Sequence, residues 1–432
     1  MRVLFLFPIC AALLMAAKTD SSKATFHKDV LPVLQKNCQG CHRPGEAAPM
    51  SFLTYEETRP WAKAIREAVL LKRMPPWFAD PHVGKFANDR SLSQPEIDTL
   101  VKWADTGAAE GDPKDAPAPL KFVDGWNIGE PEYLVEMPQE FEVPASGTIE
   151  YTYFVLPTGF TEDRWVRMAE ARPGNRKVVH HIIAFVREPG SKWLQDAKPG
   201  EPFVPKKRGE GEGEDGGMSG EFLVGYAPGT VPEVVAPGQA KRIKAGSDIV
   251  LQMHYTANGK VETDRTRVGF IFAKEPPEER VMTIAANNRK FVIPPGADNH
   301  RVDASITLHA DATLTGMLPH MHLRGKSFEY RIVFPDGETR QILNVPKYDF
   351  NWQLSYYPEE PIRLPKGTRI ECTAHYDNSA NNPANPDPKS EVRYGDQSWE
   401  EMMFGFFNVA FDADMDPADL FREKKKETAT DD

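Results

Sequence analysis

From about Phe122 onward the chain consists of short apolar runs separated by turn residues, and this pattern constrains the fold most strongly. The runs are rich in β-branched and aromatic residues and span residues 148–155, 177–185, 247–255, 266–272, 313–322 and 404–411. Many short strands with regular turns are typical of sandwiches or jelly rolls. One sandwich usually holds about 100 residues. The sequence therefore predicts two β domains, at 118–288 and 289–421, with the boundary in a polar, proline-bearing stretch.

The residues before this region show helical periodicity instead. Thr54 with Glu57 and Ser93 with Glu96 match the capping-box pattern that begins helices. Apolar residues recur after Ser93 at the spacing of one helix face. We expect a small α-helical domain over 24–112, followed by a linker rich in proline and alanine.

The two ends of the chain carry their own signals. Residues 1–17 combine Arg2, an apolar stretch from Val3 to Met15 and a small-residue cleavage site, which is the pattern of a secretory signal peptide. About thirteen apolar residues are too few to span a bilayer, which takes about twenty. We therefore expect a periplasmic or secreted protein without a membrane span, ending in a polar tail at 422–432.

Charge and cysteine content exclude several classes of protein. The formal net charge is −11 and the chain has no long basic cluster, which argues against nucleic acid as a partner. After removal of the signal peptide only Cys38, Cys41 and Cys372 remain, so a disulfide framework is not expected.

Cys38-Gln39-Gly40-Cys41-His42 is the strongest single motif. Two thiols at this spacing form thioethers with the vinyl groups of haem, while the adjacent histidine ligates the iron. A zinc site would need a second ligand pair nearby, and a redox dithiol would need an α/β context, and neither is visible. The motif predicts a covalently bound haem c.

The sixth ligand of the haem iron is predicted to be Met74, because a thioether raises the haem potential and suits an electron carrier. Met50 and His82 are the alternatives. The module, with Met74 between two helices, resembles class I cytochromes c.

The histidines downstream fall into three short patterns. His320 and His322 are two residues apart in a predicted strand, so both side chains point to one face, about 7 Å apart along the backbone. His180 and His181 are adjacent, which sends them to opposite faces of a regular strand, so a shared ion would require a bulge or a strand end. His254 would complete a set of three imidazoles with that pair.

Met402 would add a sulfur ligand to the His320 and His322 pair. Neutral nitrogens combined with a weak sulfur ligand stabilise Cu(I), whereas zinc sites seldom include methionine. The ligand types alone predict two unlike copper sites.

The order of these motifs resembles the copper type II ascorbate-dependent monooxygenases, which include peptidylglycine α-hydroxylating and dopamine β-monooxygenases. The resemblance covers roughly residues 120–415 and leaves the haem module outside it. It implies two jelly-roll-like domains with one copper on each. The matching segments are Val-His180-His181-Ile, Leu-Gln252-Met-His254-Tyr, Pro-His320-Met-His322-Leu-Arg-Gly-Lys and Trp-Glu-Glu401-Met402.

By this resemblance, His180, His181 and His254 hold an electron-transfer copper, and the second site holds the copper that binds and activates oxygen. The ligands of that second site are His320, His322 and Met402, with Met403 as the alternative thioether.

The chain departs from the family where peptide-amidating members hold the substrate carboxylate. Those positions are Leu318, Phe404 and Phe406 here, so a peptide carboxylate has no evident anchor, and an apolar or aromatic substrate is the alternative.

The predicted fold class is therefore multidomain, with a small all-α cytochrome c domain followed by two all-β, jelly-roll-like sandwich domains. The predicted function is a copper-dependent monooxygenase that hydroxylates an aliphatic C–H bond of a small substrate with O2. Electrons would pass from an external donor to the haem, then to the electron-transfer copper and then to the oxygen-activating copper, and ascorbate is a second candidate reductant.

A second hypothesis, from another class, is an exported electron-transfer or copper-binding protein without oxygenase turnover. Substrate-dependent oxygen uptake distinguishes the two.

Overall fold

The computed structural model describes residues 23–46, 48–122, 125–205, 220–228, 230 and 232–422. The predicted signal peptide (1–17) and the tail from residue 423 lie outside the described residues. The protein is mostly β, with 35% strand and 12% helix arranged in several sheets, which confirms the β-rich part of the prediction. Among the described residues, no helix combines the length and the apolar character needed to cross a bilayer.

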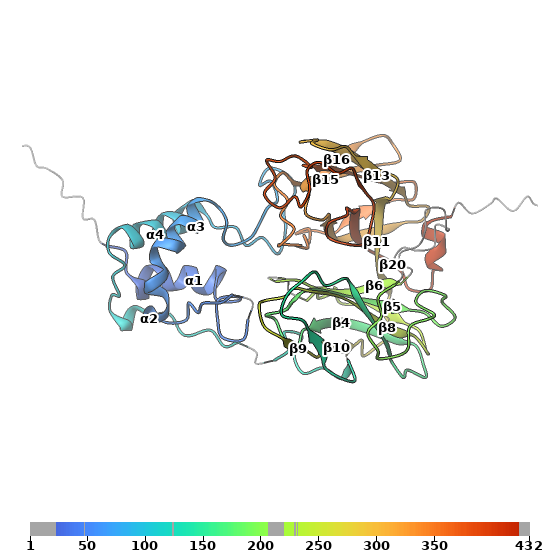
Figure 1. Cartoon of the computed structure of the whole chain (residues 1–432), viewed down its shortest axis with the longest axis horizontal. Helices are drawn as coiled ribbons and strands as arrows, with labels where there is room; N and C mark the ends of the chain where they lie inside the picture. Colours follow the sequence, from blue (N-terminus) through green and yellow to red (C-terminus); the bar gives the residue numbers. More distant parts are fainter. Residues whose placement is uncertain are drawn as a thin grey trace, which may run out of the picture.

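The N-terminal helices pack around a core of their own, at the left of Figure 1, and are called the helical module below. Both predicted capping boxes form, at Thr54 with Glu57 and at Ser93 with Glu96. The core is built around buried aromatic residues such as Phe26. The elements are η1 (Phe26–Val30), α1 (Leu31–Asn37), α2 (Tyr55–Thr58), η2 (Arg59–Trp61), α3 (Ala62–Leu70), α4 (Gln94–Asp105) and η3 (Pro113–Asp115).

The N-terminal sandwich follows. One sheet has the strand order β1-β10-β4-β7 and the other β3-β8-β5-β6, and their facing apolar side chains form one core. The short strands β2 and β9 pair separately. The bounds are β1 (Tyr133–Glu136), β2 (Phe141–Val143), β3 (Thr152–Pro157), β4 (Arg164–Arg172), β5 (Val179–Arg187), β6 (Glu221–Tyr226), β7 (Gln239–Ile243), β8 (Asp248–Tyr255), β9 (Glu262–Asp264) and β10 (Arg267–Phe272).

The C-terminal sandwich repeats this arrangement with the orders β11-β20-β14-β17 and β13-β18-β15-β16 around a second core. The two sandwiches lie one above the other in Figure 1. The bounds are β11 (Glu279–Asn288), β12 (Val292–Ile293), β13 (His300–Thr307), β14 (Ala312–His320), β15 (Gly325–Val333), β16 (Thr339–Val345), β17 (Ile362–Leu364), β18 (Arg369–Tyr376), β19 (Val392–Arg393), β20 (Met403–Asp412) and η5 (Pro417–Leu420).

The strands β7 and β11 join the two sandwiches. They pair in parallel over a short register, Glu279 with Gln239 and Arg280 with Ala240, so one sheet runs through both units. β11 pairs with β20 along its whole length and contributes Ile284 to the C-terminal core. The predicted domain boundary at 288/289 follows β11. The packing of β11 in the C-terminal core instead places the boundary before this strand. The reason is that β11 is fixed by a partner more than 100 residues away, which local composition does not reveal.

Residues 71–92 leave the helical module and lie against the C-terminal sandwich. The rings of Trp77 and Phe86 pack on Tyr356, with ring centroids 4.9 and 5.6 Å away. The N–H of Asp80 donates to the carbonyl of Asn344 at 2.8 Å. This segment, called the docking arm below, lies within the predicted 24–112 domain but ties that domain to the β region.

Candidate metal centres

His180, His181 and His254 come together between two paired strands and are called the three-histidine group. His181 on β5 lies directly opposite His254 on β8, and the register shifts between Val179 and His181. This irregularity is the bulge that two adjacent histidines need in order to face one ion. It turns His180 toward the same point as His181 rather than to the opposite face.

The spacing of the ring nitrogens fits a bound metal. Nδ1 of His181 lies 3.1 Å from Nδ1 of His180 and 3.3 Å from Nδ1 of His254. Ligand atoms about 2.0–2.1 Å from one ion lie roughly 3 Å from each other, as these do. The three side chains each offer one nitrogen, all within 4.8 Å of one another, so the group could hold a metal ion.

Burial keeps these imidazoles neutral. It lowers the pKa of His254 to about 3, with the charge of His180 as the next cause, and it holds the pKa of His181 well below its usual value. Burial also lowers the pKa of His180. A neutral imidazole has a free lone pair at pH 7, which is the form that binds metals.

His320 and His322, called the His-Met-His pair, lie at the end of β14. His320 is the last residue of the strand and His322 lies beyond it, so the predicted strand 313–322 ends two residues early. Their ring centroids are 5.3 Å apart. Burial lowers the pKa of His320 to about 4 and holds that of His322 well below its usual value, so both are neutral.

Each ring of the pair has one nitrogen occupied by a protein acceptor. Nδ1 of His320 donates to Oε1 of Gln353 at 2.7 Å, and Nδ1 of His322 donates to the carbonyl of Glu400 at 3.3 Å. These bonds fix the tautomer that leaves Nε2 bare. Nε2 of His322 is buried without a hydrogen-bond partner, which is the state expected of a ligand atom turned toward a metal.

The structure separates Met402 from its alternative Met403. Met403 is fully buried in the C-terminal core. Met402 packs with Phe404 and Phe406 on the opposite face, and His320 lies on that face with its ring 6.2 Å from Phe406. Because side chains alternate along a strand, only Met402 shares a face with the His-Met-His pair.

Glu401 supports the loop that carries His322. No local sequence pattern assigned it a role. Its carboxylate accepts from the N–H of His322 at 2.9 Å and from the N–H of Arg324 at 2.7 Å. Burial raises its pKa to about 8, which the backbone N–H of Arg324 opposes. In the sequence, the position of Glu401 directly before Met402 is the feature that could have indicated this supporting role.

Phe350 contacts both histidine clusters and was not found from the sequence. Its ring stacks on His180 with centroids 5.4 Å apart, and it meets His322 edge-on at 6.0 Å. Its ring is also 6.2 Å from that of His254. The three-histidine group and the His-Met-His pair therefore both contact one aromatic ring, a proximity between residues 180 and 322 that no local pattern encodes.

The predicted haem motif lies where α1 ends. Cys38 is the C-cap residue of α1, and the N–H groups of Cys41 and His42 donate to its carbonyl at 3.1 and 2.9 Å. Neither thiol is in a disulfide. The His42 ring stacks on Phe52 at 4.2 Å, and its Nδ1 is buried without a hydrogen-bond partner. The two free thiols are available for thioether bonds to a haem, and Cys41 lines a cavity between the helical module and the N-terminal sandwich.

The three candidates for the sixth ligand lie in different surroundings. Met50 packs against the core of the helical module, as does Cys38. Met74 is half-buried at the start of the docking arm and is outside that core. His82 is exposed on the arm, where its Nδ1 pairs with Asp80 at 2.9 Å.

Comparison with known proteins adds no family. No family model and no curated protein matches the chain. Among solved structures, the infectious bursal disease virus Gx strain matches at 11% identity over 70% of this chain and 77% of that one, with a TM-score of 0.18. The VP2 subviral particle of the same virus matches at 11% identity over 67% and 74%, with a TM-score of 0.20. Allantoicase matches at 11% identity over 55% and 79%, with a TM-score of 0.17. These scores are too low to carry an argument.

Proposed function

We propose that the chain is a copper-dependent monooxygenase that hydroxylates an aliphatic C–H bond of a small substrate. Substrate, O2, two electrons and two protons give the alcohol and water. The observation that carries the proposal is that the three-histidine group and the His-Met-His pair, which differ in their ligands, both contact the ring of Phe350. Two one-electron centres close to each other suit a reaction that needs two electrons.

The two groups suit different duties. The three-histidine group offers a set of nitrogens alone, as a site that only stores an electron requires. At the other site Met402 would add a weak sulfur ligand, which favours Cu(I). Copper held there supplies the binding and reduction of dioxygen. Gln353 orients His320 and the Glu400 carbonyl orients His322, and both rings are buried.

The finer fold assignment belongs to the same proposal. The helical module would be a cytochrome c domain, with a haem attached to Cys38 and Cys41 and its iron ligated by His42. Bound there, the haem supplies single electrons. The two sandwiches would be jelly-roll-like copper domains of the type that the ordered histidine motifs resemble.

The position of β6 supports delivery of electrons to the three-histidine group first. Tyr226 on β6 lines the cavity beside Cys41, and it pairs with Ile182, the neighbour of His181. Arg176 donates to the Tyr226 hydroxyl at 3.2 Å and pairs with Glu46 of the helical module at 3.4 Å. These contacts connect the cavity beside Cys41 to the three-histidine group.

The decisive experiment combines metal analysis with oxygen uptake on the full chain. We expect one haem and two coppers per chain, and oxygen uptake that depends on substrate and yields a hydroxylated product. Absence of substrate-dependent uptake across a broad substrate panel, with both metals bound, would favour an exported electron-transfer or copper-binding protein.

A second measurement tests the sixth haem ligand. Met74→Ala should change the haem spectrum and lower its midpoint potential, because loss of a thioether ligand removes the stabilisation of the reduced iron. Met50→Ala is the matched variant. If Met50→Ala produces the shift and Met74→Ala does not, the ligand is Met50, whose packing beside Cys38 already makes it the competitor.

A further inference from the structure

A pocket between the two sandwiches connects both histidine groups to a buried polar cluster. His181 and His320 line it, together with residues of β4, β6, β11, β14 and β20. We call it the inter-domain pocket. Because one candidate ligand of each group lines it, its chemistry bears on the substrate of the proposed reaction.

One end of the pocket, called the polar end, is a connected chain of hydrogen bonds. The Thr283 hydroxyl donates to Oδ1 of Asn408 at 2.7 Å, and Nδ2 of Asn408 donates to Oε1 of Glu233 at 2.6 Å. Glu233 pairs with Lys241 at 3.1 Å, and Lys241 also donates to the carbonyl of Leu223 at 2.8 Å. The cluster lies where β7 and β11 join, so both sandwiches contribute to it.

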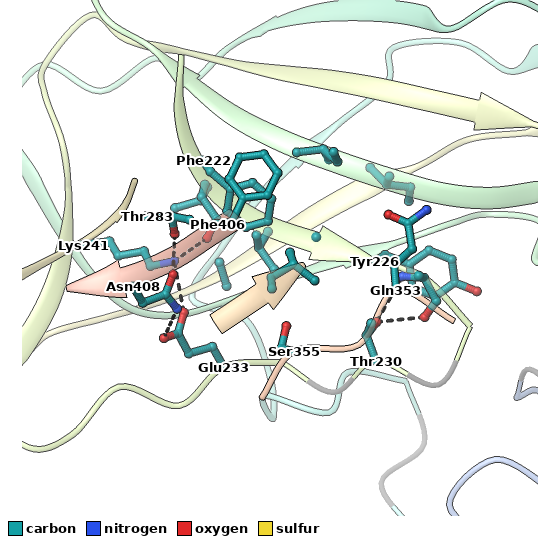
Figure 2. A pocket seen from close by; sticks show the side chains of 18 of the residues that line it. Phe222, Tyr226, Thr230, Glu233, Lys241, Thr283, Gln353, Ser355, Phe406 and Asn408 are labelled. Atoms are coloured by element: carbon teal, nitrogen blue, oxygen red, sulfur yellow. Dashed lines mark hydrogen bonds and ion pairs between the residues drawn. The ribbon is translucent and has the colours of Figure 1, made fainter. Parts of the chain in front are cut away.

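The opposite end of the pocket carries Gln353, whose amide oxygen holds His320, and the two ends are separated in Figure 2 by apolar side chains. Phe222 and Phe406, 5.9 Å apart, lie next to Thr283 and Lys241 on the side of the polar end in Figure 2, and Leu318 also lines the pocket. A ligand would therefore meet a polar group, then an apolar wall, then the His-Met-His pair.

The charges at the polar end compensate each other. Glu233 and Lys241 form an ion pair, so a carboxylate at this end would meet Glu233 and an ammonium would meet Lys241. Arg167 also lines the pocket, outside this pair. A neutral group meets no like charge at Glu233 or Lys241. The Thr283 hydroxyl can still accept and the Asn408 amide can still donate, because each has hydrogen-bonding capacity beyond the bonds above.

We propose that the inter-domain pocket binds an elongated apolar molecule with a neutral hydrogen-bonding group, such as a hydroxyl or carbonyl, at one end. That group lies at the polar end, the apolar body packs on Phe222, Leu318 and Phe406, and the far end lies beside His320. This inference rests on the proposed monooxygenase function and names its substrate class.

The test is calorimetric titration of the metal-free full chain with three probes of equal length, octan-1-ol, octanoate and octylammonium. We expect octan-1-ol to bind at least about tenfold more tightly than either ion, because each ion meets a like charge of the Glu233–Lys241 pair at the polar end. Equal binding of all three probes, or tightest binding of octanoate or octylammonium, would overturn the proposal.

Two variants locate the probe. Thr283→Val removes one hydrogen bond at nearly constant volume and should weaken octan-1-ol about three- to tenfold. Thr373→Val is the control, because its hydroxyl bonds Asp303 on an exposed face. An unchanged affinity in Thr283→Val would contradict the proposal. Glu233→Gln leaves Lys241 without its partner and should reverse the preference toward octanoate; if that variant does not fold, Thr283→Val alone decides.

The outcomes separate this inference from the proposed function. Octan-1-ol binding that depends on Thr283, in a chain that consumes no oxygen, would leave the pocket assignment intact and reject the monooxygenase. Copper binding and substrate-dependent oxygen uptake, without selective binding of octan-1-ol, would retain the enzyme and reject this substrate class.

Discussion

The three-histidine group and the His-Met-His pair are both built from neutral, buried imidazoles, but they are supported differently. In the first, the Nδ1 atoms converge on one another, and a bulge in β5 is what makes this possible. In the second, the Nδ1 atoms are held by Gln353 and the Glu400 carbonyl, which leaves Nε2 free. The first site is therefore assembled by strand geometry and the second by hydrogen bonds from outside the ligand set.

The largest effect is expected from removing a ligand at one of the two sites. His322→Ala removes a ligand of the His-Met-His pair and should abolish product formation and one of two bound coppers, while copper at the three-histidine group is retained. His309→Ala is the matched control. Copper stoichiometry and oxygen uptake measure the result, and loss of both coppers would show that the sites are not independent.

Acid should destabilise the metal-free chain through both groups. Unfolded imidazoles take up protons as the pH falls through about 6.5. In the folded chain burial lowers the pKa to about 4 for His320 and to about 3 for His254, so these imidazoles stay neutral to a lower pH. The stability that neutral folded histidines contribute is thus present above pH 6.5 and decreases toward those values, by about 3 kcal/mol for His320 and somewhat more for His254.

Chemical unfolding of the metal-free chain between pH 7 and 4 checks this. His254→Gln should reduce the acid sensitivity more than His320→Gln, because its folded pKa is lower. Equal pH dependence in the wild type and both variants would contradict the assigned burial.

The hydrogen bond from His320 Nδ1 to Gln353 supports only one of the two sites, so its removal should weaken that site alone. Gln353→Leu takes away the acceptor of His320 Nδ1–H and should weaken copper binding at the His-Met-His pair by about 10–100-fold. The three-histidine group, which Gln353 does not contact, should be unchanged. Gln341→Leu, at an exposed pair with Glu329, serves as the control, and copper titration at both sites is the measurement.

The smallest expected effect is shared by the two sites. Phe350→Ala removes the ring that contacts both His180 and His322. An aromatic pair contributes about 0.5–1.5 kcal/mol, so copper affinity should fall roughly two- to twelvefold at both sites. A fall at one site alone would show that Phe350 does not couple them.

Much of the fold could be predicted from local patterns. Both capping boxes form, and strands β3, β5, β8, β10, β14 and β20 overlap the six apolar runs. The β14 prediction ran two residues too far, because His322 lies in the turn that Glu401 stabilises from a distant part of the chain.

The sequence by itself determined which residues are able to ligate, because histidine pairs, a Cys-x-x-Cys-His motif and strand alternation are local properties of the chain. Only the tertiary structure decided that the two histidine groups share Phe350, that Met402 rather than Met403 shares a face with His320, and that β11 belongs to the C-terminal sandwich. Each depends on strand register between residues far apart in sequence. Register is set by the packing of whole sheets, which no short window of sequence contains.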